Sequence, residues 1–290
     1  MTTLGAVFRP QLPPERLRSV ARAADEAGLE ELWIWEDCFR EGGISSAAMA
    51  LAWTTQLRLG IGLMPVPFRN VALSAMELAT LARVFPGRVR PAVGHGVQDW
   101  MAQVGARPAS PMTCLREHLS ALQALLAGER VTTSGRYVHL DDVALDWPPA
   151  QPPALITGAT GDRTLRLSGE LAAGTILTGG TTPDGVRRAR GIVDEGRALA
   201  GRSDHHEVVV YLVAAAGPDS AERLERECRR WEFPAGADVT VGGDAESVAN
   251  GVRRWAEAGA DTVVLQPTED EPDLEGFVRF AGEQVRPLLG

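Results

Sequence analysis

Short apolar segments alternate with segments of helical periodicity along almost the whole 290-residue chain. The apolar segments have the length and composition of buried β-strands, whereas the segments between them repeat apolar residues three and four positions apart, as amphipathic helices do. The predicted strands are residues 4–8, 32–35, a stretch from 58 onward, 89–93, 154–157, 174–178, 208–215 and 261–265. The predicted helices are residues 14–27, 45–54, 70–85, 112–127, 162–171, 183–200, 220–231, 246–258 and 274–288.

Strands that alternate with helices pair in parallel, because each crossover helix returns the chain to the same end of the sheet. Eight such units favour a closed (β/α)8 barrel, the TIM barrel, for which about 250 residues are typical. We therefore predict a single α/β domain over residues 1–290, with an open doubly wound sheet as the alternative. The irregular segment around Tyr137–Leu140 predicts an insertion outside the barrel, between the fourth and fifth strands.

Charge and composition exclude several classes of function. The formal net charge of −9 argues against a general nucleic-acid binder, since phosphate backbones attract a basic surface. The three cysteines are far apart, so neither a disulfide framework nor a CxxC motif is indicated, and we predict no metal site. No apolar run approaches the ~20 residues that cross a bilayer, and the first residues lack a signal-peptide pattern. We therefore expect a cytoplasmic protein that binds no membrane.

The segment Arg58–Asn70 begins as a strand, is broken by glycines and prolines, and ends where a helix begins. Gly60 and Gly62 weaken strand pairing and let the backbone approach a ligand. Asn70 is a good cap for the helix that follows. A loop between a strand and a helix is where α/β proteins place ligand sites. The alternative is an ordinary buried strand followed by a turn.

Glycine pairs follow four consecutive predicted strands: Gly60/Gly62, Gly94/Gly96, Gly158/Gly161 and Gly179/Gly180. In a barrel these loops share the carboxyl-terminal rim, the face on which such enzymes build active sites. Loops without side chains there indicate a large, flat ligand that lies against backbone. The loop Gly158–Gly161 leads directly into a helix, whose first amides and dipole favour a phosphate group.

Several segments resemble one known family when they are taken together and in order. They are Ala24–Gly28 with Leu32-Trp33, Thr54–Gly60, Leu81–Arg83 with Pro86–Arg88, Gly94–Gly96, Gly158–Gly161 with Leu165–Leu167, and Ala256–Asp261. They resemble the luciferase-like monooxygenase superfamily, and in particular its branch of oxidoreductases that use the deazaflavin coenzyme F420, such as methylenetetrahydromethanopterin reductase. Each motif is modestly specific, but the ordered set spans nearly the whole chain.

The resemblance implies a barrel of the bacterial luciferase type that holds a flavin or deazaflavin ring at its carboxyl-terminal rim. A bulge in the third strand, with a non-prolyl cis peptide at about Gly62-Leu63, is expected to support the ring. The loop Gly94–Gly96 would border the ring, Gly158–Gly161 would bind the cofactor phosphate, and Thr178-Gly179 would lie beside it. The predicted cofactor-binding residues are Gly62, Leu63, Met64, Gly94, His95, Gly96, Gly158, Ala159, Thr160, Gly161, Thr178 and Gly179.

The candidate catalytic residues are Glu36, Asp37 and His95. Many relatives end the second strand with Asp-His, and that histidine is a candidate proton donor or acceptor, whereas this chain has Glu36-Asp37. Adjacent side chains of an extended strand face opposite ways, so at most one of the two is expected to face the ring. His95 is the third candidate because its ordinary pKa, near 6.5, suits proton transfer. Each could instead be structural: a solvated carboxylate, a helix cap, or a loop histidine bonded to backbone.

The resemblance predicts hydride transfer between coenzyme F420 and a small organic substrate. Two alternatives stay open: an FMN-dependent monooxygenase of the same fold, and a non-catalytic flavin- or deazaflavin-binding protein that lacks an acid-base group. We also expect a homodimer, because small apolar residues on helix 70–85 allow close helix packing, although they would serve equally against the barrel. These residues are Ala72, Ala75, Ala79 and Ala82.

Overall fold

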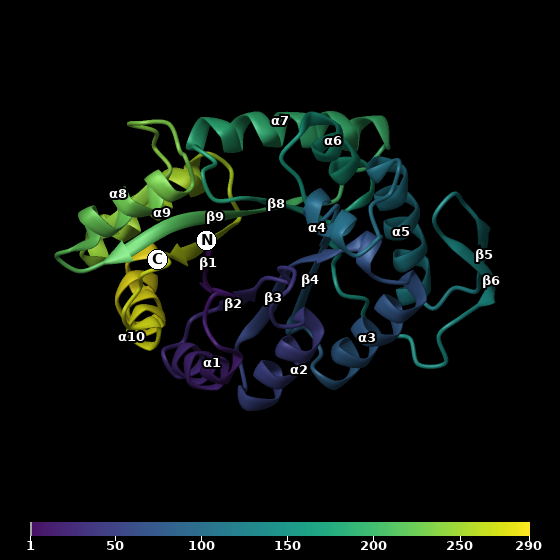
Figure 1. Cartoon of the computed structure of the whole chain (residues 1–290), viewed down its shortest axis with the longest axis horizontal. Coiled ribbons are helices and arrows are strands. Elements are labelled where there is room, and N and C mark those ends of the chain that lie inside the picture. Colours follow the sequence, from purple (N-terminus) through teal and green to yellow (C-terminus); the bar gives the residue numbers. More distant parts are fainter. Residues whose placement is uncertain (1) are drawn as a thin grey trace.

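The structure is a computed structural model and describes residues 2–290. Eight parallel strands close into a barrel in the order β1-β2-β3-β4-β7-β8-β9-β11, with β11 paired back to β1 and helices around the outside (Figure 1). They are β1 (Thr3–Phe8), β2 (Glu31–Ile34), β3 (Arg58–Pro65), β4 (Val89–Gly94), β7 (Ile156–Gly158), β8 (Gly174–Leu177), β9 (Glu207–Ala216) and β11 (Thr262–Pro267). The predicted (β/α)8 barrel is confirmed, and the open sheet is excluded.

Helices cover the outside of the barrel close to where the sequence predicts them, except for a short helix over residues 98–103 that was not predicted. They are α1 (Leu17–Glu26), α2 (Gly43–Trp53), α3 (Val71–Val84), α4 (Gln98–Gln103), α5 (Pro111–Leu126), α6 (Asp162–Leu171), α7 (Pro183–Leu199), α8 (Ser220–Arg230), α9 (Ala245–Glu257) and α10 (Leu274–Arg279). Asn70 caps α3 by accepting a hydrogen bond from the Ala72 amide at 2.9 Å. The helix predicted over 274–288 is α-helical only to Arg279, after which come π and 3-10 turns. Pro287 lacks the amide proton that a regular helix needs there.

Three further strands lie outside the barrel. The antiparallel hairpin of β5 (Val131–Ser134) and β6 (His139–Val143), at the right of Figure 1, confirms the predicted insertion. Strand β10 (Thr240–Gly243) pairs in parallel with the last residues of β9 and was not predicted. Only Val241 in β10 is a strand-forming apolar residue, so the pattern was too weak to detect.

The barrel interior is a packed core. Its buried residues come from alternate strand positions and are Val7, Trp33, Trp35, Ala92, Ile156, Ile176, Val209, Tyr211 and Val264. Gly60 makes room for the largest of them, because a Cβ on Gly60 would lie 2.1 Å from the Trp33 ring. This glycine accommodates a neighbouring side chain, and the interpretation that it lets the backbone approach a ligand is wrong.

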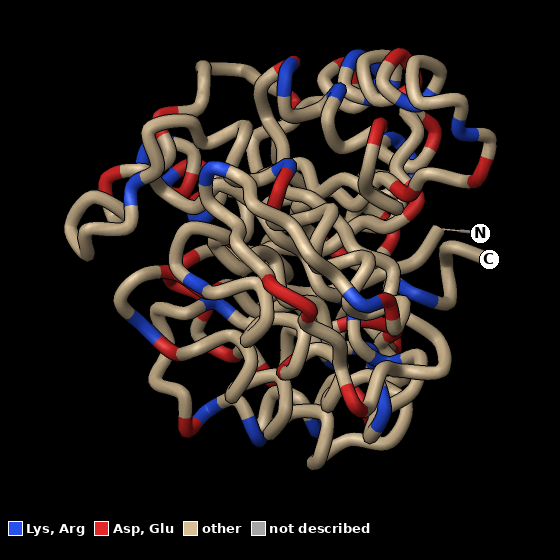
Figure 2. Tube along the Cα trace, turned by 90° about the vertical axis from the view of Figure 1, so that its right-hand side faces the viewer, with Lys and Arg blue, Asp and Glu red and all other residues tan. Residues whose placement is uncertain are grey.

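Charged residues of both signs are interspersed along the chain segments that Figure 2 shows. Many of them pair across neighbouring helices, as Arg116 does with Glu170 and Arg279 with Glu26. Such exposed pairs contribute about 0–1 kcal/mol each, so the fold is stabilised mainly by its core. Within residues 2–290, no helix combines the length and the apolar character that a membrane span requires.

Candidate active site

The third strand carries the irregularity that the resemblance implies. Its pairing with β4 changes register between Ile61 and Met64, and the Gly62-Leu63 peptide is cis. The Gly62 carbonyl accepts a hydrogen bond from the hydroxyl of Tyr211, on β9, at 3.3 Å. Met64 turns back into the outer core, whereas Leu63 is half-buried. The bulge therefore presents Leu63, and not Met64, at the carboxyl-terminal mouth of the barrel.

The side chain of Leu63 lies over the ends of the next two strands. A Cβ on Gly94 would be 2.6 Å from Leu63 Cδ2, and a Cβ on Gly158 would be 2.2 Å from it. Both glycines are needed to seat this leucine, so Leu63 covers part of the backbone at these two positions. Gly96, with a φ of +65°, lies against Pro65 in the same way. The half-buried side chain of Leu63 therefore forms the apolar surface at this part of the barrel mouth.

The start of α6 is the open part of the rim. Gly161 occupies the cap position without a side-chain hydrogen bond, and a Cβ there would meet no atom within 4 Å. Asp162, in the first turn, forms an ion pair with Arg188, in which Oδ1 lies 2.6 Å from Nη2. Uncapped amides at the start of a helix, ten residues long here, are suited to bind an anion. The amide of buried Ala159 is used within the barrel, bonded to Ile176, while Thr160 is exposed.

The loop after β8 lies beside this helix start. Thr178 is exposed, and its carbonyl accepts hydrogen bonds from the amide and hydroxyl of Thr181. Gly179 faces the side chain of Gln266, whose Oε1 would be 2.9 Å from a Cβ on that glycine. The loops after β7 and β8 therefore contribute neighbouring groups to the rim, because these strands are paired.

Glu36 is held in a network behind the rim. Its two carboxylate oxygens accept hydrogen bonds from Arg69 Nε and Nη2 at 3.0 and 2.7 Å, and Oε2 accepts a third from the Gly43 amide at 2.8 Å. Arg69 also pairs with Glu77 of α3 at 2.6 Å. The carboxylate thus ties the start of α2 to the loop before α3, an arrangement that suits anchoring better than proton transfer.

Asp37 has a different environment. Trp35, two residues earlier, lies in the barrel interior with its ring centroid 5.7 Å from that of Tyr211. Asp37 is half-buried, and its carboxylate makes no hydrogen bond to any residue among 2–290. Burial raises the pKa of Asp37, and the cations of Arg40 and Arg9 oppose that shift. An unpartnered, partly desolvated carboxyl group can exchange a proton with a ligand.

His95 lies with the α6 loop and not with the end of β2. Its Nε2 is 3.1 Å from Thr164 Oγ1 in the first turns of α6, and its Nδ1 is buried without a partner. Burial lowers the pKa of His95, and a hydrogen bond with the backbone of Pro111 opposes that shift. The structure thus places His95 beside the candidate phosphate loop. Across residues 2–290, no group of three His, Cys, Asp or Glu side chains is placed to hold a metal ion.

Sequence analysis missed an ion pair at the mouth. Arg9 follows β1 and is 2% exposed, and its Nη1 donates to Glu227 Oε1 at 2.5 Å and to the Pro267 carbonyl at 2.9 Å. Its Nη2 is buried without a partner. Arg9 and Glu227 are 218 positions apart, so no local pattern connects them. The signal available was a charged residue directly after an apolar strand.

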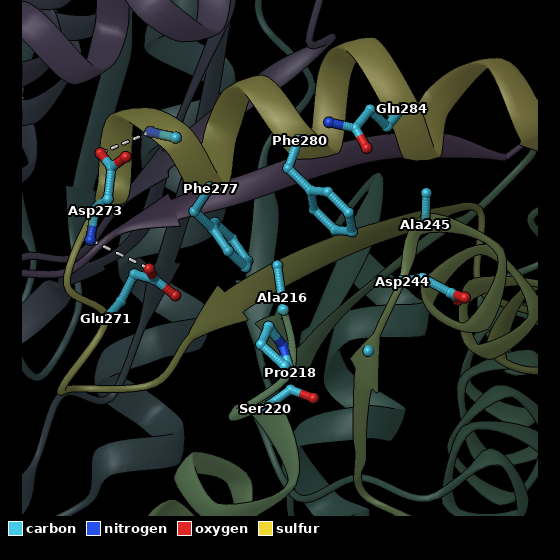
Figure 3. A pocket seen from close by; sticks show the side chains of 13 residues that line it. Ala216, Pro218, Ser220, Asp244, Ala245, Glu271, Asp273, Phe277, Phe280 and Gln284 are labelled. Atoms are coloured by element: carbon cyan, nitrogen blue, oxygen red, sulfur yellow. Dashed lines mark hydrogen bonds between the residues drawn. The ribbon is translucent and has the colours of Figure 1, made fainter.

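A surface cavity of about 740 Å³ lies elsewhere, between α10 and the turns after β9 and β10 (Figure 3). Phe277 of α10 and Phe280, directly after it, point into the cavity, opposite Pro218. Its carboxylates are occupied: Asp273 accepts from the Gly276 amide at 2.9 Å, and Glu271 pairs with Arg223 at 2.6 Å. The cavity contains none of the predicted site residues.

Comparisons with known proteins agree with this geometry. The chain is 27% identical over 222 residues to 5,10-methylenetetrahydromethanopterin reductase of Methanolobus tindarius, covering 76% of this chain and 67% of the relative. It is 30% identical to an F420-dependent glucose-6-phosphate dehydrogenase of Nakamurella multipartita, with 96% and 94% covered. A solved F420-dependent secondary alcohol dehydrogenase superposes with a TM-score of 0.87 at 21% identity, covering 100% and 99%.

The glucose-6-phosphate dehydrogenase and the alcohol dehydrogenase match this chain over nearly its whole length. Residues 3–238 also match the family described as luciferase-like monooxygenase, which is more than half of the chain. This chain therefore belongs to the luciferase-like monooxygenase family.

Proposed function

We propose that this protein is an oxidoreductase that transfers a hydride between coenzyme F420 and a small organic substrate at the barrel mouth. The observation that carries the proposal is a half-buried leucine platform next to an open, uncapped helix start: Leu63 on Gly94 and Gly158, beside Gly161. A planar ring packs on an apolar side chain while a phosphate binds helix amides. The F420-dependent relative that is 30% identical over nearly the whole chain supports the choice of deazaflavin.

In this proposal each predicted residue has a physical task. Leu63 and the Gly62 peptide support the ring, and Gly158–Gly161 bind the phosphate with Thr178-Gly179 alongside. The bound cofactor supplies or accepts the hydride. Asp37 exchanges a proton with the substrate, and His95 positions the first turns of α6 through Thr164. Met64, Gly94 and Gly96 act through packing under the ring. Glu36 keeps the surrounding loops in place.

Two alternatives keep specific support. The family description favours an FMN-dependent monooxygenase, because a flavin ring and its phosphate would use the same platform and helix start. The engagement of Glu36 by Arg69 and the placement of His95 at α6 favour a non-catalytic binding protein, since two of the three acid-base candidates are then structural. Turnover of reduced cofactor above its buffer blank, with enones, imines and nitro compounds as substrates, separates this last alternative from an enzyme.

Replacing Gly161 with aspartate tests the phosphate loop. Nothing lies within 4 Å of the new Cβ, so the fold is expected to survive, while the added carboxylate repels a phosphate. We expect the cofactor dissociation constant to rise at least tenfold, equivalent to about 1.4 kcal/mol. Gly161→Ala is the matched control, with binding near the wild-type value. Unchanged cofactor titration by Gly161→Asp, with intact thermal unfolding, would remove this loop from the site.

We also propose a homodimer, through a different face of α3 from the one that the sequence suggested. Ala75, Ala79 and Ala82 are buried against the barrel, whereas Leu73 and Met76 are 46% and 58% exposed. Light scattering at micromolar concentration is expected to give about twice the 31.0 kDa of one chain. Met76→Asp should shift the mass to that of one chain; a wild-type monomer would contradict the proposal. The cytoplasmic location stays a prediction.

A further inference from the structure

Arg9 is a buried cation that is fixed in place yet incompletely bonded. Glu227, itself 3% exposed, holds Nη1, and the Pro267 carbonyl accepts from the same nitrogen. Glu227 is anchored in turn by Trp231 Nε1 at 2.9 Å and by the Glu269 amide at 3.1 Å. The guanidinium is therefore rigidly placed, while its Nη2 has no acceptor.

Stability does not explain this arrangement. A buried ion pair is often no more stabilising than apolar residues of the same volume, and a buried donor without an acceptor is costly. Buried polar groups in native proteins are nearly always bonded, so an exception indicates a functional use or a missing partner. The Nη2 of Arg9 is therefore best understood as a donor kept for a ligand.

Arg9 directly follows β1, at the carboxyl-terminal end of the barrel. Val7 is an interior residue and Phe8 belongs to the outer core, so Arg9 again lies on the inner side. On the paired strand β11, Gln266 is 3% exposed and its amide makes no hydrogen bond to any of the residues 2–290. Gln266 reaches toward Gly179, and Pro267, which follows it, bonds to Arg9. Two polar groups without a partner among the described residues, Arg9 Nη2 and the Gln266 amide, thus belong to the ends of two paired strands.

The charges around this position select the kind of ligand group. Glu227 already balances the charge of Arg9, and the carboxylate of Asp37 lies within electrostatic reach of it. Arg40, the other cation near Asp37, is exposed and donates to the Pro10 carbonyl at 3.2 Å. Arg9 Nη2 and the Gln266 amide are therefore available donors without an excess of positive charge around them. A neutral acceptor oxygen suits these donors better than a carboxylate, because Glu227 already neutralises the charge of Arg9.

We propose that Arg9 Nη2 and the Gln266 amide receive the substrate oxygen, which makes the substrate a neutral ketone or aldehyde, or the corresponding alcohol. The inference rests on the proposed function. In the reducing direction the carbonyl carbon gains a hydride from the reduced deazaflavin, the oxygen gains a proton from Asp37, and the products are an alcohol and the oxidised deazaflavin. The two donors stabilise the negative charge that develops on the oxygen. Because Nη2 is shielded from water, side chains beside it must part when the substrate enters.

Ligand binding to the folded protein tests this without turnover. Acetophenone and benzoate are titrated, with and without oxidised F420, by saturation-transfer NMR against wild type, Arg9→Met, Arg9→Lys and Gln266→Met. We expect acetophenone to bind wild type more tightly than benzoate does, and to lose at least tenfold in affinity in Arg9→Met and severalfold in Gln266→Met. Arg9→Lys should retain part of the affinity, and Arg40→Met is the matched control, with no loss.

Removing Arg9 leaves Glu227 buried and unpaired, so Arg9→Met alone can fail to fold. The double variant Arg9→Met/Glu227→Met avoids this, and Gln266→Met keeps the ion pair. Unchanged acetophenone binding in folded Arg9 variants, or benzoate binding that depends on Arg9, would overturn the proposal. F420 titration by fluorescence on the same variants should be unaffected. If wild type binds no F420, the proposed function fails. The titrations of acetophenone and benzoate without F420 still test whether Arg9 and Gln266 bind a carbonyl oxygen.

Discussion

Asp37→Asn is expected to lower turnover by about 10²- to 10⁴-fold while leaving the cofactor dissociation constant unchanged. This is the usual contribution of a positioned acid or base. Among the three candidates, only Asp37 combines a half-buried position at the mouth with a carboxylate that accepts no hydrogen bond within the described chain. Steady-state kinetics with reduced cofactor, together with fluorescence titration of the oxidised form, separates an effect on chemistry from an effect on binding.

The pH dependence of the reduction rate tests whether Asp37 acts as a proton donor. Burial raises the pKa of Asp37, although Arg40 and Arg9 reduce the shift. A carboxyl group that donates a proton is active when protonated, so the rate of reduction should fall as the pH rises through its pKa. In Asp37→Asn, this fall of the rate with rising pH should disappear.

Glu36→Gln is the matched control for Asp37→Asn. It should leave the pH profile in place and lower the free energy of unfolding by about 1–3 kcal/mol, because Arg69 and the Gly43 amide lose a charged partner. Full activity of Asp37→Asn beside an inactive, folded Glu36→Gln would reverse the assignment.

Gly62→Ala is expected to damage the platform at the barrel mouth. A Cβ on Gly62 would lie 2.1 Å from the Tyr211 hydroxyl and 3.0 Å from the Trp33 ring, so the bulge and Leu63 must move. Overpacking of this kind costs about 1–3 kcal/mol in unfolding free energy. We also expect cofactor affinity to fall at least tenfold, because Leu63 is the proposed support of the ring.

Tyr211→Phe supplies the second arm of a double-mutant cycle. Alone, it removes the hydrogen bond to the Gly62 carbonyl and should cost about 1 kcal/mol. Combined with Gly62→Ala, it removes the atom that the new methyl group strikes, so the double variant should be more stable than Gly62→Ala alone. Chemical denaturation of the four proteins measures this coupling, and strictly additive effects would contradict the described contact.

The parts of the fold that were predictable are those with a strong local signal. The eight barrel strands lie in short apolar segments that alternate with helical periodicity, and Asn70 is a residue type that caps helices, so both could be identified before any contact was known. β10 was missed because a four-residue strand with one apolar side chain has almost no periodicity. Its presence depends on pairing with β9, which is a tertiary effect.

The candidate site was predictable only as a set of loops. Parallel strands place their carboxyl ends together, so the rim position of the glycines followed from the fold class. The side chain that packs over these glycines could not be predicted. Leu63 covers Gly94 and Gly158 because of the bulge in β3, and no sequence pattern gives the direction of a side chain in a bulge. Alternation along an extended strand could not select between Glu36 and Asp37, because both follow the end of β2 at Ile34. Arg9 and Glu227 meet only in the folded barrel.

Titration of coenzyme F420 and of FMN into the protein by fluorescence tests the central claim most directly. The proposed function predicts saturable F420 binding with a dissociation constant in the micromolar range, weaker binding of FMN, and at least a tenfold loss for Gly161→Asp. Tight FMN binding with no detectable F420 binding would contradict the proposal and favour the FMN-dependent monooxygenase.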